Sequence, residues 1–308
     1  MLAAGYPARS SLSENWPDCA RLTPHVLALE RAGAPGIAAS DYLFNQASIY
    51  LQQMAVYGDA LRLAERSLEM KRARLPESDR KVAVGWSMLG LAYKEAGRLE
   101  EAVAAQAESV RLFEAHDHGP ETLATAYNNR ASAIRALGQK TNDRALLEQA
   151  HAQNEKALAA ESSSAGEESE EVASSLANLA VSHNALGQSD PALERSGQAL
   201  AIWQKVLPPG DARLGTSLNT HGGLLLKDGQ TVEAEGLLRE ALELRRRAYG
   251  RDDHPNVKNT VSWLVSCLLV LARGGDTEKR ADAERLCTEF GLDWEKEQRD
   301  ALQFPDPA

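Results

Sequence analysis

One short stretch, WSMLGLAYKEAGRLEEA, spaces its apolar residues as a helix does and not as a strand. Trp86, Leu89 and Tyr93 are three and four residues apart, which places their side chains on one helix face. Gly90 lies beside this stripe, where a larger side chain would hold a partner helix away. Gly97 follows, and glycine enters the left-handed conformation at little cost. The pattern therefore predicts two helices joined by a turn at Gly97.

The same arrangement returns along most of the chain. Residues equivalent to Gly90 are mostly small or short: Ser48, Ala131, Ala180, Gly222 and Val265. A second column, in the second helix of each pair, is entirely alanine: Ala60, Ala102, Ala150, Ala192, Ala234 and Ala283. Turn residues corresponding to Gly97 are Ala55, Gly138, Gly187 and Gly229. Two independent columns with one common period of about 42 residues predict a repeat protein built from helical hairpins.

The period divides the chain into three parts. Residues 1–36 are expected to hold an N-terminal segment and a capping helix, and residues 291–308 a closing helix with a tail. Residues 37–290 hold six repeat units, at about 40–72, 82–115, 122–160, 171–206, 213–249 and 256–290. Capping elements are expected because the terminal repeats of such an array would otherwise expose an apolar face.

The residues of the second unit resemble those of the tetratricopeptide repeat. Trp86, Leu89, Gly90, Tyr93 and Gly97 carry the resemblance, together with Leu99 and Ala102. The long period and the linkers LPPGDARLG and AYGRDDHPNV are similar to those of the kinesin-light-chain-like branch. The resemblance implies an all-α, right-handed superhelical solenoid of about six helix-turn-helix hairpins, whose concave wall is lined by the first helix of each hairpin.

Several local features are predicted at the ends and interruptions. Thr23 followed by Pro24 is typical of an N-cap and first helical residue, with Gly33 and Pro35 ending that helix. Extra residues in the third unit predict an early start of its second helix, capped by Thr141 or Asn142. The Ser/Glu-rich stretch 159–171 indicates a mobile acidic loop. A closing helix is expected at 293–303, followed by a frayed tail.

The stretch WPDCARLTPHV is similar to the junction before the repeats of STAND proteins of the NB-ARC or NACHT kind. The sequence has no Walker motif, GxxxxGK[ST]. The resemblance therefore implies the repeat portion of such a protein, either as a fragment or as a free-standing relative.

Composition restricts the function classes further. The 308 residues are 43% hydrophobic but only 5% aromatic, and the net charge is −10, which argues against nucleic acid as a partner. The three cysteines form no CxxC pair, so we expect reduced thiols. The first residues lack the features of a signal peptide, and the apolar run 261–272 is too short to span a bilayer. We expect a cytoplasmic protein with no membrane partner.

Catalytic chemistry is not indicated by the sequence. The HDH stretch at 116–118 hints at a metal, but it lies in a loop where histidines are usually solvated, and no further ligands have fixed spacing. His183 and His221 stand near helix-packing positions, which favours a structural role over that of a base. We expect no enzyme activity, no cofactor and no metal.

Asparagine on one face of the first helices points instead to binding. The candidate peptide-binding residues are Asn45, Asn128, Asn129, Asn178 and Asn219. Asparagine is a poor helix former, and its amide offers both a donor and an acceptor to the main chain of an extended peptide. One turn further along, Lys94, Arg135 and Lys227 are placed to meet acidic side chains or a terminal carboxylate. The alternative is that these polar residues merely keep an exposed face solvated.

The sequence thus predicts a non-enzymatic interaction module that binds a peptide or protein segment in a concave groove. It would be the sensor or scaffold arm of a STAND-type signalling protein. The alternative is a self-associating structural scaffold, or a cargo adaptor resembling kinesin light chain. The oligomeric state is left open.

Overall fold

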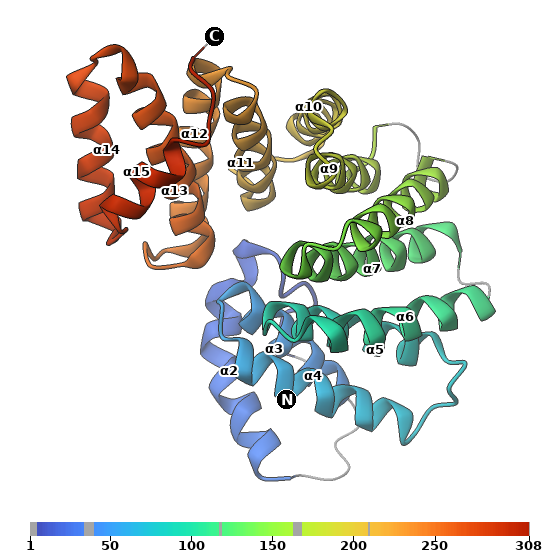
Figure 1. Cartoon of the computed structure of the whole chain (residues 1–308). Coiled ribbons are helices and arrows are strands. Elements are labelled where there is room, and N and C mark those ends of the chain that lie inside the picture. The colour runs from blue at the N-terminus through green and yellow to red at the C-terminus, as the bar shows by residue number, and fades with distance from the viewer. Residues whose placement is uncertain (1–4, 34–39, 117–118, 163–167, 209, 308) are drawn as a thin grey trace. The chain divides into compact units, whose positions relative to one another are not determined.

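Helices make up all the regular structure of the residues that can be described (Figure 1). The structure, a computed structural model, describes residues 5–33, 40–116, 119–162, 168–208 and 210–307. The chain divides into two units, Met1–Gly166 and Glu167–Ala308. The expectation of an all-α fold is confirmed. None of the helices in the described ranges is long and apolar enough to cross a membrane.

The first unit contains one capping helix and three helical hairpins. A short 3₁₀ helix, η1 (Ser13–Asn15), precedes the capping helix α2 (Trp16–Arg31). The hairpins are α3 (Ser40–Gln53) with α4 (Tyr57–Arg72), α5 (Arg80–Glu95) with α6 (Leu99–Ala115), and α7 (Pro120–Thr141) with α8 (Arg144–Ser162). Each helix packs against the next one along the chain, and α5 also contacts the first helices α3 and α7.

The second unit repeats this plan. Its hairpins are α9 (Glu170–Ala185) with α10 (Ser189–Val206), α11 (Ala212–Lys227) with α12 (Thr231–Tyr249), and α13 (Pro255–Leu271) with α14 (Thr277–Phe290). A 3₁₀ turn, η2 (Ala272–Gly274), follows α13, and the closing helix α15 (Trp294–Ala301) packs on α13. The first helices α9 and α11, and α11 and α13, contact one another.

The two columns of small residues lie close together in five of the six described hairpins, as the sequence predicts. The Ser48 hydroxyl donates to the carbonyl of Ala60 over 2.7 Å. A Cβ atom on Gly222 would lie 3.4 Å from the carbonyl oxygen of Ala234. The remaining pairs share buried clusters: Ala131 with Ala150, Ala180 with Ala192, and Val265 with Ala283. Small side chains therefore let paired helices approach closely along both units.

Gly90 makes room for a side chain of the partner helix. A Cβ atom there would lie 2.6 Å from Nε2 of Gln106. Gln106 is fully buried, and its Nε2 donates to the carbonyl of Ser87 over 2.9 Å. The glycine therefore permits a hydrogen bond between α6 and the main chain of α5, in addition to close packing.

The predicted turn residues are confirmed at four of five positions. Gly97, Gly187, Gly229 and Ala55 have φ angles of 76°, 78°, 86° and 59°, all in the left-handed region. An alanine pays a steric cost for this conformation that glycine does not.

The prediction for the third unit is confirmed for the early start of its second helix, and it is wrong for the turn residue and the cap. Gly138 is a helical residue of α7, where a Cβ atom would lie 3.0 Å from Cβ of Leu146. The turn comes later, at Asn142 with φ 54°, and Asp143 caps α8 by accepting from the N–H of Ala145. The extra residues therefore lengthen both helices: α7 runs ten residues past Ala131, and α8 begins six residues before Ala150, where α6 begins three residues before Ala102. Asparagine tolerates the left-handed conformation and aspartate is a strong N-cap, so the turn forms at Asn142 and Asp143 and not at Gly138.

The prediction for the capping helix is also wrong at its start. Helix α2 begins at Trp16, with a proline in its first turn, and continues through Pro24. Thr23 is not a cap: its hydroxyl donates to the carbonyl of Cys19 over 2.7 Å, inside the helix. The helix ends before Gly33, which has φ 61°. Pro35 lies outside the described residues.

Two segments predicted to be irregular are more ordered than expected. In the stretch 159–171, α8 continues to Ser162 and α9 begins at Glu170, while 163–167 lie outside the described residues. In the described part of the tail after α15, Phe304 is only 6% exposed and packs against the core of the second unit, whereas residues 305–307 are exposed. The closing helix itself is confirmed.

Replacing Gly90 by leucine is expected to lower the free energy of unfolding by about 1–3 kcal/mol, because the new side chain displaces Gln106 and overpacks the hairpin. Urea unfolding followed by circular dichroism measures the change. The matched control is Gly236→Leu in α12, where a Cβ atom meets nothing within 4 Å. There, stability should hold or rise by about 0.5–1 kcal/mol, since leucine is the better helix former. Equal losses in both variants would contradict the packing role of Gly90.

Candidate inner-face binding site

The candidate residues of the first unit lie on α3, α5 and α7, and two of them link neighbouring hairpins. Asn129 Nδ2 donates to the hydroxyl of Ser87 over 3.1 Å. Lys94 Nζ donates to the hydroxyl of Ser132 over 3.2 Å and also lies 3.1 Å from a carboxylate oxygen of Glu95. These polar groups therefore join one repeat to the next.

The other candidates of the first unit are partly or largely withdrawn from the surface. Asn128 is only 7% exposed. Asn45 is half-buried, and its Oδ1 has no hydrogen-bond partner among the described residues. Arg135 donates to Oε1 of Gln139 over 3.2 Å, and burial lowers the pKa of its guanidinium. The structure does not gather these five residues into one open row of amides.

In the second unit, Asn178 lies on α9, and Asn219 and Lys227 on α11. Asn219 is 8% exposed, and its Nδ2 donates over 3.3 Å to Oδ1 of Asn259 on α13. Its own Oδ1 is buried, with no hydrogen-bond partner among the described residues. Asn259 was missed by the sequence analysis, because it stands one helical turn before Ser262, which is the residue equivalent to Asn219 in the last hairpin.

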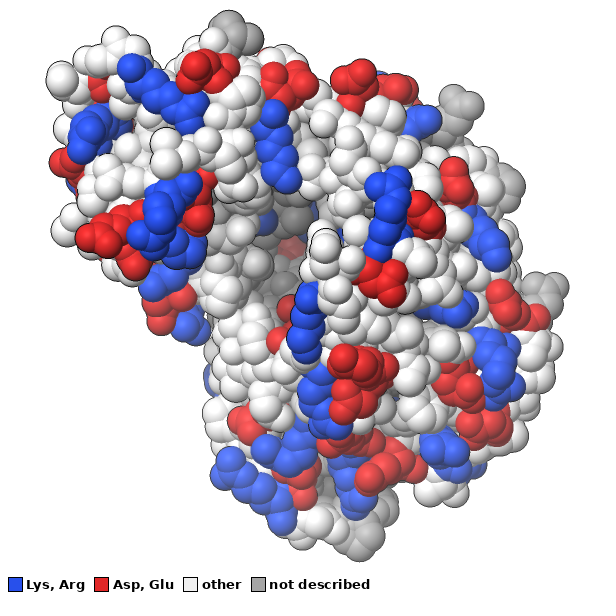
Figure 2. Space-filling view, in the orientation of Figure 1, with Lys and Arg blue, Asp and Glu red and all other residues white. Residues whose placement is uncertain are grey.

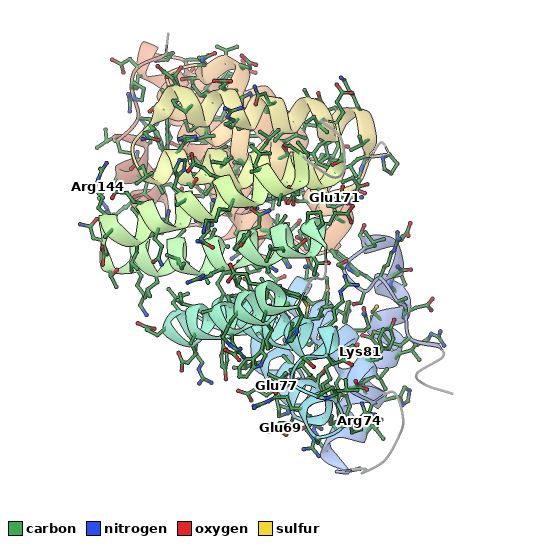
Figure 3. All side chains as sticks on the ribbon, turned by 90° about the vertical axis from the view of Figure 1, so that its right-hand side faces the viewer. Glu69, Arg74, Glu77, Lys81, Arg144 and Glu171 are labelled. Atoms are coloured by element: carbon green, nitrogen blue, oxygen red, sulfur yellow. The ribbon has the colours of Figure 1, made fainter. Side chains whose placement is uncertain are left out.

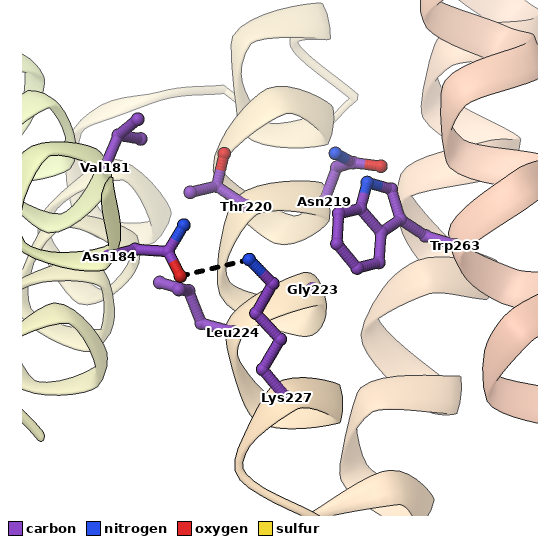
Figure 4. A pocket seen from close by; sticks show the side chains of 8 residues that line it. All are labelled: Val181, Asn184, Asn219, Thr220, Gly223, Leu224, Lys227 and Trp263. Carbon is purple, nitrogen blue, oxygen red and sulfur yellow. Dashed lines mark hydrogen bonds between the residues drawn. The ribbon is translucent and has the colours of Figure 1, made fainter. Parts of the chain in front are cut away.

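Asn219 and Lys227 border a small pocket on the first helices of the second unit (Figure 4). Its volume is about 150 Å³. The lining residues are Val181 and Asn184 of α9, Asn219, Thr220, Gly223, Leu224 and Lys227 of α11, and Trp263 of α13. Three consecutive first helices thus contribute side chains to one recess.

The aromatic wall of the pocket lies against Gly223. A Cβ atom at Gly223 would lie 3.5 Å from the indole of Trp263, so the ring packs directly on α11. The ammonium of Lys227 lies 5.7 Å from the centroid of the same ring. Trp263 stands one repeat after Thr220, so the repeat period could have predicted its place on the same helix face. The sequence analysis named candidate residues on the first helices of the earlier hairpins and none on that of the sixth.

Lys227 is the cationic group of the pocket. Its Nζ donates to Oδ1 of Asn184 over 3.1 Å (Figure 4). Partial burial lowers the pKa of Lys227, and no carboxylate offsets that shift. In the part of the chain that the structure describes, Lys227 forms no ion pair. Asn184 was also missed from the sequence, although it stands one helical turn after Leu179 and Ala180 on the same face as the packing residues.

Elsewhere the surface charges are mostly arranged as local pairs. Arg74 pairs with Asp41 at 2.8 Å, and Arg72 with Glu77 at 3.5 Å. Glu69, Arg74, Glu77 and Lys81 project from neighbouring parts of the first unit (Figure 3). On the face shown in Figure 2, blue and red side chains are interspersed within each unit. Paired exposed charges contribute little to stability. Lys227 differs from these residues because it has no carboxylate partner among the described residues.

A serine–histidine contact joins α10 and α11. His221 Nδ1 lies 2.7 Å from the hydroxyl of Ser196, and burial lowers the pKa of the imidazole. The Ser196 hydroxyl also lies 3.0 Å from the carbonyl oxygen of Leu193. The single proton of the hydroxyl can be donated either to the carbonyl of Leu193 or to Nδ1 of His221, depending on the tautomer of the imidazole. Both side chains pack α10 against α11.

The described residues do not gather metal ligands. Among them, no group of three His, Cys, Asp or Glu side chains could hold a metal ion. His116 ends α6, and the other two residues of the HDH stretch lie outside the described residues.

The pocket offers a cation, amides and an indole, which are groups that bind carbonyls, carboxylates and apolar side chains.

Comparisons with known proteins agree with this architecture. The sequence profile described as tetratricopeptide repeat matches residues 172–212 and 214–256, which contain α9 to α12. No protein with a curated description has a significantly similar sequence.

Several solved structures share the fold. A kinesin-light-chain-type protein of Podosopora anserina with nearly identical TPR-like repeats is 21% identical, with a TM-score of 0.50 over 67% of this chain and 95% of that one. A Rap protein complexed with competence and sporulation factor is 12% identical, with a TM-score of 0.63 over 92% and 70%. NprR in complex with its cognate peptide NprX is 14% identical, with a TM-score of 0.57 over 96% and 79%.

At these identities the likeness to solved structures establishes the fold, and the profile match identifies the repeat. The chain therefore contains tetratricopeptide repeats and has the fold of kinesin-light-chain-like repeat proteins.

Proposed function

We propose that this protein is a non-enzymatic interaction module that binds a peptide or an extended protein segment on the inner face of its first helices. The pocket of the second unit is the centre of the proposed site, and Asn219 and Lys227 are its predicted members. Asn45, Asn128, Asn129, Asn178, Lys94 and Arg135 remain candidate contacts on the other first helices. The net charge of −10 supports a protein partner over nucleic acid.

The observation that carries the proposal is the unpaired ammonium of Lys227 between an amide and an indole. A cation in a recess without a counter-charge gains free energy when a carboxylate or carbonyl reaches it. The indole of Trp263 offers apolar surface to the neighbouring side chain of the same ligand. A recess of about 150 Å³ is large enough for one side chain or chain end, and not for a whole folded partner.

The solved neighbours support binding of peptides by this fold. Rap was solved with competence and sporulation factor, and NprR with its cognate peptide NprX. We infer, as part of the same proposal, that the module is the cytoplasmic sensor or scaffold arm of a STAND-type signalling protein. The stretch WPDCARLTPHV, which opens α2, supports that context.

A second candidate is a self-associating scaffold or a cargo adaptor. It is favoured by the likeness to kinesin-light-chain-type repeats, which covers 67% of the chain. Light scattering that gives a monomer at every concentration would count against self-association and leave the peptide-binding proposal untouched.

An array of nine-residue peptides, half of them containing Asp or Glu, tests the proposed site. We expect a subset of acidic peptides to bind the unaltered chain, and Lys227→Ala to weaken that binding by about tenfold or more, since a charge-assisted contact is worth roughly 1.5–3 kcal/mol. The matched control is Lys205→Ala, because Lys205 pairs with Glu168 outside the pocket. If Lys227→Ala and Lys205→Ala bind the array alike, the pocket is not the site.

The affinity for an acidic peptide should fall as the pH rises. Burial lowers the pKa of Lys227 below that of an ordinary lysine, so the ammonium is lost, and with it the attraction for a carboxylate, at a lower pH than usual. Isothermal titration between pH 7 and pH 10 measures the fall. Lys227→Arg should make the profile flat, because a guanidinium keeps its proton throughout this range. A flat profile for the unaltered chain would remove Lys227 from the binding step.

A further inference from the structure

The segment after α15 is held against the second unit by one arginine and one aromatic ring. Arg273, in the 3₁₀ turn after α13, donates to the carbonyl of Ala301 over 2.8 Å and to the carbonyl of Phe304 over 3.0 Å. The same guanidinium donates to Oδ1 of Asp306 over 2.8 Å. Arg273 thus binds two main-chain oxygens and one carboxylate of the segment.

Phe304 fills a recess beside Trp263. Its ring is 6% exposed, and its centroid lies 5.8 Å from that of the indole, with the two planes tilted by 52°. Edge-to-face and tilted aromatic pairs of this kind are favourable beyond the area that they bury. Trp263 is also a wall of the inner-face pocket, so the segment and the pocket share one side chain.

Gly229 leaves space for the main chain of the segment. A Cβ atom there would lie 3.3 Å from the carbonyl oxygen of Asp306 and 3.5 Å from Cγ of Pro305. Gly229, Trp263 and Arg273 come from three different parts of the unit, and together they form a corner. The corner contacts an aromatic side chain, a main-chain carbonyl and a carboxylate two residues after the aromatic one.

The remaining contacts of the segment are sparse. Leu302 is 76% exposed, and the side chain of Asp306 is 83% exposed. An ion pair with so exposed a carboxylate is weak, and the residues after α15 form no further helix. The segment is therefore held mainly by Phe304 and Arg273, and another segment with the same groups could replace it without loss of contacts.

We propose that the corner of Gly229, Trp263 and Arg273 is a recognition site for an extended protein segment in which an aromatic residue is followed, two positions later, by an acidic one. Phe304 and Asp306 occupy this corner as an exchangeable internal ligand. A partner segment of this chemistry docks when it displaces them, and the displacement frees the side of Trp263 that Phe304 contacts.

The internal segment is tethered to the corner, and this determines how tightly a partner segment must bind in order to displace it. A tethered segment has an effective concentration of the order of millimolar, so a free peptide of identical sequence competes poorly at micromolar concentration. When the internal aromatic side chain is removed, the same peptide should enter the corner without competition. This difference makes the exchange measurable with the chain's own sequence.

The test measures fluorescence anisotropy of a labelled peptide, ALQFPDP, which copies residues 301–307. We expect its dissociation constant to be at least tenfold lower for the full chain carrying Phe304→Ala than for the unaltered chain. The matched variant Leu302→Ala, which alters an exposed residue of the same segment, should bind the peptide as weakly as the unaltered chain. A peptide with Phe replaced by Ala should not bind, and one with Asp replaced by Asn should bind more weakly.

Equal binding of the peptide to the unaltered and Phe304→Ala chains would overturn the proposal, as would equal binding of the peptide without Phe. If circular dichroism shows that Phe304→Ala does not fold, Asp306→Lys replaces it, since a lysine there repels Arg273 and loosens the segment. A gain in affinity is then expected, smaller than for Phe304→Ala because Phe304 stays in place, and the absence of any gain would overturn the proposal. Lys227→Ala should leave these results unchanged, so failure of the inner-face proposal and failure of this one are distinguishable.

Discussion

Close approach of paired helices, permitted by small side chains at their crossing points, is the constraint on which the rest of the structure depends. Ser48 bonds directly to the main chain at Ala60, and Gly222 leaves only van der Waals space for the carbonyl of Ala234. A side chain too large for such a point would separate the helices and shift every contact that depends on them. Because interiors are close-packed, such a shift has no void to absorb it.

Glycines also determine where the functional groups lie. Gly223 lets the indole of Trp263 rest on α11, and this brings Lys227 within 5.7 Å of the ring. Gly229, in the turn after the same helix, leaves space for the segment that follows α15. Helix α11 and the turn that follows it therefore carry one glycine for the partner helix, one beside the pocket and one for the docked segment. Because the three glycines face different neighbours, substitution of Gly222 should affect helix packing, substitution of Gly223 the pocket, and substitution of Gly229 the docked segment.

Polar side chains join neighbouring hairpins at the repeat period. Ser87 pairs with Asn129, Asn184 with Lys227, and Asn219 with Asn259. Buried polar groups are costly unless they are hydrogen-bonded, so these pairs favour one register between successive first helices. The recurrence of asparagine on this face is thus explained in part by contacts within the protein. A ligand at the inner face would meet amides that are already held in place.

Local rules predicted much of this molecule from its sequence. The six hairpins, the left-handed turns at Gly97 and Ala55 and the closing helix follow from spacing and from glycine-like positions. Gly138 misled because Asn142 and Asp143 together form a better turn and cap, and Thr23 because a threonine before proline is not always a helix start. To assign Asn184 and Trp263 to one pocket, one must know which side chains of successive repeats lie close together in space. The docking of Phe304 depends on contacts across more than thirty residues of sequence, which periodicity does not report.

Disulfide trapping tests the central claim most directly. Ala131→Cys with Ala150→Cys joins the two columns in the first unit, and Ala180→Cys with Ala192→Cys does so in the second, while the native cysteines are buried. A disulfide needs Cα atoms about 4.4–6.8 Å apart. The account predicts that both pairs cross-link under mild oxidation with full retention of helical circular dichroism, whereas Ala131→Cys with the exposed Ala145→Cys does not. Failure of both column pairs to cross-link in a folded protein would contradict the close approach of these helices.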